Sequence, residues 1–359
     1  MFDRPAVMNR PSWDDGKDVL KDYADLTNLV EKKEYSPSDK AKMLTIMKRR
    51  GLLDGQSEYI RLREIRGKLV KRPKSGSAQI VADGRDDWIG WFELKKEHVK
   101  ETAIENTARV IKAVNADVLC IVEAESRTAL NRFNDSVIAK IKGERYEHVM
   151  LIDGNDDRGI DVGIMTRQGF PVEGIRSHVD DELDGKKIFS RDCAEFEIRT
   201  PSGNRLLVLV NHFKSKGYGS LGASNAKRKI QAQRVRAIYQ QRLSDGFQFI
   251  AIAGDLNDSP GSAPLQPLVG NNSKLIDIMV HDAYAGDGRP GTWETGTTIK
   301  KKLDYILMSE ELAQMVQHGG IERRGIWMGK HSKLPRFQQV NGENDAASDH
   351  AALWVDLNL

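Results

Sequence analysis

Hydrophobic and polar positions divide the chain into a helical beginning and a long strand-rich remainder. Apolar side chains recur at helical spacing between Val19 and Val30, as expected of an amphipathic helix. Ser36, Pro37 and Asp39 then supply an N-cap, a proline at the first helical position and an acid in the first turn. We therefore predict a helical appendage over residues 1–55. The basic run at 48–50 that closes it is either a nucleic-acid or partner contact, or a solvated helix end that complements the helix dipole.

After residue 55 the period of the pattern shortens from that of a helix to that of a strand. Helices are expected only near 97–115 and 226–243, and each lies between strand candidates. The main candidates are YIRLREIRGKLV, WIGWFEL, DVLCIVEAE, YEHVMLID, IDVGIMTR, CAEFEIRT, RLLVLVNHF, FQFIAIAGDLN, LDYILMS and HAALWVDLNL. Many strands with few helices predict a layered α/β domain over residues 56–359.

Composition excludes several classes of protein. Hydrophobic residues make up 39% of the chain and charged residues 30%, as in a globular protein with a sizeable core. No apolar run is long enough to cross a membrane, and the first residues lack a secretory signal, so a cytoplasmic location is expected. Two cysteines, Cys120 and Cys193, exclude a disulfide scaffold. The net charge of +3 permits nucleic-acid binding without requiring it.

Several predicted strands end, or begin, at polar side chains of the kinds found in active sites. These residues are Glu123, Asn211, His212, Asp255, Asn257, Asp304, Asp349 and His350. A rigid sheet can hold such groups around one point. Each alone is more often a turn residue or a satisfied structural group, but their joint occurrence indicates a functional site.

The residue types fit phosphoester hydrolysis. Glu123 and Asp349 offer the hard oxygen ligands that Mg²⁺ or Mn²⁺ prefers. Asp255 and Asn257 are two positions apart, so on an extended segment one could orient a water while the other holds the attacked group. The histidines, together with Lys214 after the first of them, could bind phosphate oxygens or protonate a leaving group.

The stretches ADVLCIVEAES, RGIDVGIMTR, VNHFKSKG, AGDLNDSP, LDYILMS and SDHAAL resemble, in order, those of the endonuclease/exonuclease/phosphatase superfamily, which includes deoxyribonuclease I. The resemblance runs from about Ala116 to the C-terminus. It implies a four-layered α/β sandwich of two packed mixed β-sheets flanked by helices, with a divalent-metal site at one end.

The resemblance also implies roles for single residues. Asp255 and Asn257 match the pair that positions the attacking water and the phosphate, and His350 matches the histidine that contacts the scissile phosphate. Asp304 matches the acid that pairs with this histidine. His212 is similar to the other active-site histidine of the deoxyribonuclease I and sphingomyelinase branches, where repair nucleases usually carry tyrosine.

The expected metal ligands are Glu123, Asp349 and Glu64. The last stands where the family normally has asparagine on its first core strand, so it is either a ligand, a sign of a different register, or a mark of a degenerate site. Asn211, Lys214 and Arg191 are the substrate-binding candidates. Arg191 either contacts phosphate or forms a structural ion pair, and Asp161 either orients His212 or does likewise.

We therefore predict a Mg²⁺- or Mn²⁺-dependent phosphodiesterase, a nuclease acting on DNA or RNA. The alternatives are a phospholipid or sphingomyelin phosphodiesterase, a phosphatase, or an inactive binding protein on the same scaffold. The cations on the helix near 226–243 are either phosphate contacts or a solvated helix face. Trp88 and Trp91 are expected to be core or sheet-packing aromatics.

Overall fold

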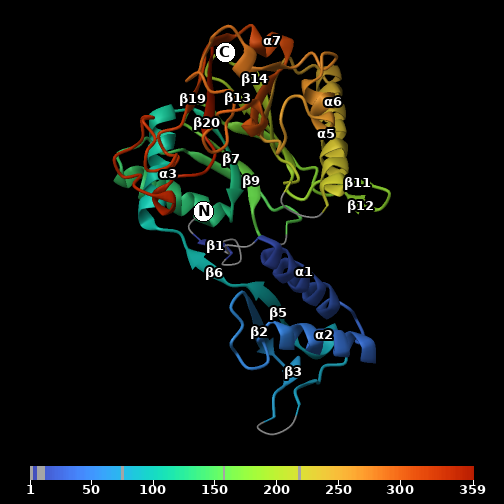
Figure 1. The fold of residues 1–359 in the computed structure, drawn as a ribbon. Helices are drawn as coiled ribbons and strands as arrows, with labels where there is room; N and C mark the ends of the chain where they lie inside the picture. The colour runs from blue at the N-terminus through green and yellow to red at the C-terminus, as the bar shows by residue number, and fades with distance from the viewer. Residues whose placement is uncertain (1–2, 6–12, 74–76, 157, 217–219) are drawn as a thin grey trace. The chain divides into compact units, whose positions relative to one another are not determined.

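The chain forms two compact units, residues 2–98 and residues 99–359. The computed structural model describes residues 3–5, 13–73, 77–156, 158–216 and 220–359 (Figure 1). Within these residues, none of the helices is long and apolar enough to cross a membrane.

The N-terminal unit contains two helices and three two-stranded antiparallel sheets, β1–β6, β2–β5 and β3–β4. Its elements are β1 (Asp3–Pro5), α1 (Trp13–Val30), α2 (Pro37–Arg49), β2 (Ile60–Arg66), β3 (Val70–Lys71), β4 (Gln79–Ile80), η2 (Arg85–Asp87), β5 (Ile89–Leu94) and β6 (Lys96–His98). The predicted start of α2 is confirmed: the Ser36 side chain accepts from the Asp39 backbone N–H, and the Asp39 side chain accepts from the Ser36 N–H.

One hydrophobic core joins the helices of this unit to its strands. Leu26 of α1 and Met43 of α2 are fully buried in the same cluster as Ile60, Trp88 and Phe92. The compact unit therefore extends to His98, whereas the sequence pattern placed a boundary at residue 55. The spacing of hydrophobic residues changes from helical to strand-like near residue 55. A change of secondary structure does not mark a domain boundary, because helices and strands can share one core.

The C-terminal unit is built on a six-stranded mixed sheet in the order β10-β13-β14-β15-β18-β16, beside two three-stranded sheets, β7-β9-β8 and β17-β19-β20. Its strands are β7 (Val118–Ala124), β8 (His148–Ile152), β9 (Asp161–Thr166), β10 (Val172–Arg176), β11 (Glu182–Leu183), β12 (Lys186–Lys187), β13 (Cys193–Arg199), β14 (Arg205–His212), β15 (Phe249–Asp255), β16 (Ile276–Asp277), β17 (Tyr284–Ala285), β18 (Asp304–Met308), β19 (Val316–Glu322) and β20 (Ala352–Leu357). Its helices are α3 (Glu101–Val114), α4 (Arg127–Arg132), η3 (Phe133–Ile138), α5 (Leu221–Ser244), η4 (Ala263–Leu265), α6 (Gln266–Val269), η5 (Ile278–Val280), η6 (Ile299–Lys301), α7 (Glu310–Ala313) and η7 (Glu343–Asp345).

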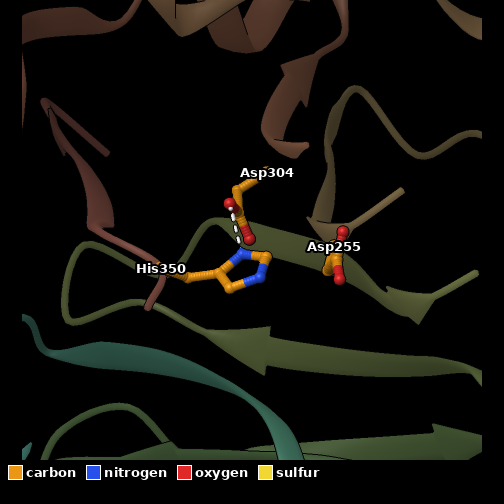
Figure 2. A group of neighbouring side chains, drawn as sticks. All are labelled: Asp255, Asp304 and His350. Atoms are coloured by element: carbon orange, nitrogen blue, oxygen red, sulfur yellow. Dashed lines mark hydrogen bonds and ion pairs between the residues drawn. The ribbon is translucent and has the colours of Figure 1, made fainter. Parts of the chain in front are cut away.

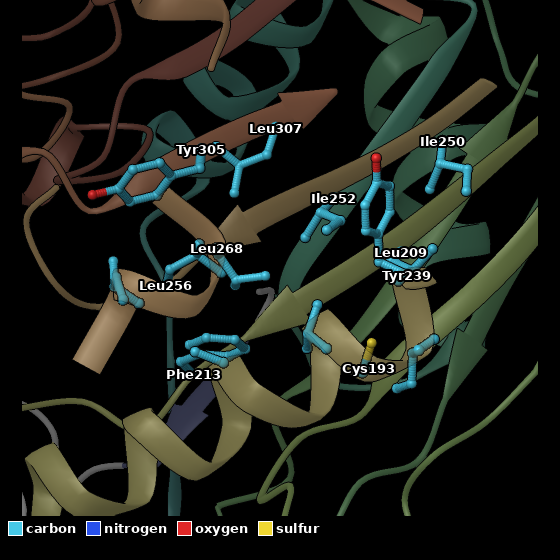
Figure 3. Close-up of a cluster of buried hydrophobic side chains, with 14 of the residues drawn as sticks. Cys193, Leu209, Phe213, Tyr239, Ile250, Ile252, Leu256, Leu268, Tyr305 and Leu307 are labelled. Atoms are coloured by element: carbon cyan, nitrogen blue, oxygen red, sulfur yellow. The ribbon is translucent and has the colours of Figure 1, made fainter. Parts of the chain in front are cut away.

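Strand β14 shows how the six-stranded sheet is buried on both faces. Leu207 and Leu209 point into a core shared with α5 and α6, which Figure 3 shows. Leu206, Val208 and Val210 point into a second core, which contains residues of β7, β9 and β20. The strand therefore reads as a continuous apolar run instead of an alternating one. The mixed α/β class with several sheets and flanking helices is confirmed.

Most cations of α5 are engaged inside the unit. Arg228 is fully buried against Asp258, Arg234 bonds Asp181 at 2.6 Å, and Arg236 donates to the carbonyl of Ser273. The charge run on this helix is therefore largely structural, and its paired arginines do not form the solvated helix face that was one of its two interpretations.

A buried ion-pair network ties α5 to β13 and supplies a test of stability. Glu195 is 2% exposed and accepts bonds from Arg242 at 2.6 and 2.8 Å, while a His178 ring nitrogen lies 2.7 Å away. Burial raises the pKa of Glu195, but the hydrogen bonds of Arg242 and His178 outweigh this and hold it at about 2. Glu195→Ala should lower the free energy of unfolding by about 3–5 kcal/mol, because it removes the buried partner of Arg242 and His178, which keep only Asp245 and Asp181. In wild type this stabilisation should persist above pH 4.5 and disappear as the pH falls toward 2. Urea unfolding between pH 3 and pH 7 measures both, and equal stabilities at pH 7 would refute the prediction.

Candidate active site

Three neighbouring strands of the six-stranded sheet bring polar side chains into one row. His212 ends β14 and pairs in register with Asp255, the last residue of β15. Asp255 pairs in turn with Asp304, the first residue of β18. Because β14 and β15 are parallel and β18 is antiparallel to β15, all three residues meet at one edge of the sheet.

Gly254 makes the close strand pairing at this edge possible. Its φ is +130°, and a Cβ atom there would lie 1.9 Å from the carbonyl oxygen of Asn211.

Gly254→Ala should therefore separate β15 from β14 and abolish activity together with much of the stability. The matched control is Gly222→Ala on α5, where a Cβ meets nothing within 4 Å. Urea unfolding and hydrolysis assays compare the two, and a Gly254→Ala protein of wild-type stability would contradict the argument.

His350 is held by Asp304, as Figure 2 shows. Its Nδ1 lies 2.8 Å from Asp304 Oδ2, which also accepts a 2.6 Å bond from the hydroxyl of Thr292. Burial lowers the pKa of His350, but the charge and hydrogen bond of Asp304, aided by Asp255 and Asp349, raise it well above its ordinary value. His350 is therefore a cation with its Nε2–H available to an anionic ligand.

Asp255 is 6% exposed and is oriented by Asn257. The backbone N–H and the side-chain amide of Asn257 each donate to the Asp255 carboxylate at 2.8 Å, and the same amide donates to the Phe213 carbonyl at 3.1 Å. Burial and the charge of Asp304 raise the pKa of Asp255 to about 7. A carboxylate with this pKa suits proton transfer at neutral pH. Asn257 has a φ of +54°, so the turn that places its amide is strained.

His212 differs in charge from His350. Its side chain is almost fully buried, with Nε2 at 3.6 Å from Asp255 Oδ2 and 4.0 Å from Glu123 Oε1. Burial, followed by the charges of Arg191, Arg158 and His350, lowers its pKa well below the ordinary value. The two histidines therefore differ, because the surroundings of His212 lower its pKa while those of His350 raise its pKa.

Glu123 reaches the same edge from β7. Its φ is +60°, within a bulge between Ile121 and Ala124 in the pairing of β7 with β9. A non-glycine residue in this region stores strain, and such strain gathers at functional sites. The side chain is 44% exposed, so its carboxylate faces solvent beside His212. The bulge re-aims this side chain toward the row.

The donor set fits a hard divalent cation. Among the described residues, Asp255, Asp304 and His350 place potential ligand atoms within 4.8 Å of one another. A protonated histidine does not ligate a metal, so the carboxylates of Asp255 and Asp304, with that of Glu123 nearby, are the better donors.

The other two expected metal ligands have hydrogen-bond partners of their own. Asp349 is exposed, and its Oδ2 accepts a 2.9 Å bond from the indole of Trp293. Glu64 belongs to β2 of the N-terminal unit, where its Oε1 accepts bonds from the backbone N–H groups of Leu69 and Val70 at 2.8 and 3.3 Å. The structure thus corrects its placement on a core strand of the catalytic sheets, since β2 pairs with β5 in a sheet of two strands.

The substrate-binding candidates lie beside His212. Arg191 is 2% exposed and donates to Asp156 at 2.9 Å and to the Phe213 carbonyl at 2.5 Å, so it forms a structural ion pair whose charge still reaches the site. Burial and the charges of Arg191 and Arg158 lower the pKa of Lys214 to about 8. Asn211 is fully buried, and its amide donates to the Leu209 carbonyl at 3.0 Å.

Three contributors escaped the sequence pattern. Thr292 orients Asp304, Trp293 binds Asp349, and Asp156 pairs with Arg191. They lie in irregular loops, where no period marks them. Asp161, expected to orient His212 or to form an ion pair, accepts a 2.7 Å bond from the Gly154 N–H instead, and burial raises its pKa to about 6.

Comparisons with known proteins concern the family and the fold. A family model described as "Endonuclease/Exonuclease/phosphatase family" matches residues 73–284, more than half of the chain. No curated protein matches the chain.

Solved structures share the fold at low sequence identity. A mannosyl-6-phosphatase from Bacteroides thetaiotaomicron is 15% identical with a TM-score of 0.52, covering 72% of this chain and 91% of its own. A beta toxin from Staphylococcus aureus is 17% identical with a TM-score of 0.50, covering 71% and 93%. An endonuclease/exonuclease/phosphatase family protein from Bacteroides thetaiotaomicron is 15% identical with a TM-score of 0.50, covering 70% and 85%. At these identities the likeness concerns the fold.

Proposed function

The chain belongs to the endonuclease/exonuclease/phosphatase family, a family of phosphate-ester hydrolases, and from this we propose that it is a divalent-metal-dependent phosphodiesterase that cuts nucleic acid. The observation that carries the proposal is the row His212, Asp255 and Asp304 with the cation His350 held on Asp304. Acid, base and anion-binding groups then lie together at one edge of a rigid sheet.

The side chains divide the work of hydrolysis among them. Glu123 with Asp255 or Asp304 would hold a Mg²⁺ or Mn²⁺, which would supply a positive charge that offsets the charge of the phosphodiester. Asp255 orients the attacking water and accepts its proton. His350 donates a hydrogen bond to a phosphate oxygen and stabilises the charge that develops on it. Neutral His212 lies between Asp255 and Glu123, where it can share a hydrogen bond with the water or the phosphate.

The segment after β19 supports a polymeric anionic substrate. β19 ends beside the site, since Glu322 pairs with Ala352, two residues after His350. From residue 323 to residue 342 the sequence contains cations and no acid, and Lys330, Lys333 and Arg336 are exposed. The Arg336 guanidinium also lies 5.0 Å from the ring centre of Trp327. A basic segment at the catalytic edge suits a phosphate backbone.

Incubation with plasmid DNA, single-stranded DNA and RNA tests the proposal, each with Mg²⁺, Mn²⁺ or EDTA. We expect cleavage that needs the metal, and bis(p-nitrophenyl) phosphate hydrolysis reports the chemistry without a polymer. Turnover of p-nitrophenyl phosphate or sphingomyelin without cleavage of any polymer would replace the nuclease proposal with a phosphatase or lipid one.

The basic segment gives a prediction that separates binding from chemistry. Lys330→Gln, Lys333→Gln and Arg336→Gln combined should raise KM for DNA on the order of tenfold and reduce its salt dependence, because three phosphate contacts are lost. The kcat for bis(p-nitrophenyl) phosphate should stay unchanged. Steady-state kinetics at two salt concentrations measure both, with Lys229→Gln on the exposed side of α5 as the matched control. An equal loss on both substrates would assign the segment a structural role.

A further inference from the structure

The outer face of the β2–β5 sheet is uncovered within the described structure. The inner side chains Leu62 and Phe92 pack against the core of the N-terminal unit. On the opposite face, Ile65 is 66% exposed, Ile89 42% and Trp91 46%. Side chains alternate between the two faces of a strand, so these apolar and aromatic side chains lie on the face of the sheet that points away from the core.

Two tryptophans of this unit, Trp88 and Trp91, have different surroundings. Trp88 is 1% exposed, and its Nε1 donates to the hydroxyl of Tyr35 at 3.0 Å, so the expected core role holds for it. Trp91 corrects that expectation, because its indole stands on the open face directly opposite Arg63 in the antiparallel register. An exposed indole of this size is uncommon unless it binds something.

Arginines surround this indole. The side chains of Arg61 and Arg63 are 48% and 45% exposed and share one carboxylate, Glu93, at 3.6 and 2.8 Å. The cations of the adjoining strand end and hairpin, Arg66, Lys68, Lys71 and Arg72, are exposed as well. Between Ile60 and Arg72 the sequence has one acid, Glu64, which is 10% exposed, accepts bonds from backbone N–H groups and pairs with Lys68 at 3.3 Å, so it offsets one of these cations.

We propose that this face, defined by Arg61, Arg63, Arg66 and Trp91, binds single-stranded nucleic acid. A base stacks on the Trp91 indole, and the arginines on either side contact the phosphates that flank it. Charged and apolar side chains alternate on the face, with Arg63 across from Trp91, so it has no continuous apolar patch to enter a lipid bilayer. The proposal goes beyond the hydrolytic site, because binding here requires no metal and no turnover.

The test measures binding of the full chain in EDTA to a fluorescein-labelled 20-nucleotide DNA strand by fluorescence anisotropy. Trp91→Ala should weaken Kd on the order of tenfold, and Trp91→Phe should restore most of the loss because an aromatic ring remains. Arg61→Gln with Arg63→Gln should weaken binding and reduce the slope of log Kd against log salt by about one to two. The controls are Val280→Ala and Arg145→Gln, two exposed residues of the C-terminal unit with 77% and 62% exposure.

Each outcome decides a separate point. Equal Kd values for wild type and Trp91→Ala, with unchanged thermal unfolding, would overturn the proposal. So would loss of binding to phosphatidylserine vesicles in Trp91→Ala without any change in DNA binding, which would assign the face to a membrane. Hydrolysis of bis(p-nitrophenyl) phosphate should be the same in Trp91→Ala and wild type. If hydrolysis is absent from both while Trp91-dependent DNA binding is present, the proposed function fails and this inference stands.

Discussion

We expect His350→Asn to lower kcat for phosphodiester hydrolysis by about 10²- to 10⁴-fold, the range typical of losing a general acid or a cationic contact to the transition state. Asparagine can still donate a hydrogen bond to Asp304, but it carries no charge. Asp304 and Asp255 then lack the cation that neighbours them. Steady-state kinetics with bis(p-nitrophenyl) phosphate and with DNA measure the loss.

The control is His318→Asn on β19, whose side chain is 75% exposed beside Asp356. This variant removes a histidine from the same unit and should leave kcat unchanged. A His350→Asn enzyme with wild-type kcat on both substrates would remove the imidazolium from the mechanism.

The pH profile distinguishes a cationic role from a merely structural one. Asp304 raises the pKa of His350, so activity that needs the imidazolium should persist through neutral pH and decline only as pH rises through that raised value. In Asp304→Asn the charge that raises the pKa is gone, and the decline should move to lower pH. An unshifted profile would mean that the charge of His350 does not limit the reaction.

The polar residues at the strand ends of the C-terminal unit could be predicted from the sequence. The interior of a buried strand is apolar, so its functional side chains lie at its ends. His212, Asp255 and Asp304 each follow or begin an apolar run, and the strand register places them side by side. The resemblance implied that Asp304 pairs with His350, but the opposite pKa shifts of the two histidines were not accessible from the sequence. They depend on Arg191, Arg158 and Asp304, which lie near them through tertiary packing.

Glu64 shows where local pattern fails. The alternating run around it reads as a strand, and it is one, but alternation does not tell which sheet a strand joins. In the structure this strand packs with α1 and α2, and the Glu64 carboxylate binds backbone N–H groups. The departure from the asparagine of the family therefore gives no support to a degenerate site.

Replacing Asp255 by asparagine should abolish hydrolysis and at the same time stabilise the metal-free protein. Asparagine cannot accept the proton of the attacking water, so kcat should fall by about 10³-fold. The folded variant, in contrast, no longer contains a buried carboxylate at this position. Burial and Asp304 raise the pKa of Asp255 to about 7, so ionising it in the folded state is unfavourable.

The sign of the pH dependence follows from this raised pKa. Below pH 3.8 the carboxyl is neutral in both folded and unfolded chains, and the variant gains nothing. As pH rises toward 7 and beyond, the unfolded chain ionises first, and wild type loses up to about 4 kcal/mol relative to a neutral group. The Asn257 amide, which donates to Asp255 Oδ2, opposes an asparagine amide there and reduces the net gain to about 1–3 kcal/mol.

Urea unfolding in EDTA at pH 5 and pH 8 measures this gain, with Asp356→Asn, an exposed aspartate of β20, as the control. The advantage of Asp255→Asn should grow between the two pH values, while that of Asp356→Asn should not. Adding Mg²⁺ should then stabilise wild type more than Asp255→Asn. The Asp255 carboxylate destabilises the metal-free folded protein, but it is also one of the ligands that a bound cation requires. A variant less stable than wild type at pH 8 would mean that the Asn257 contact outweighs the buried charge. The strain at this sheet edge would then reside in the turn at Asn257 and not in the carboxylate.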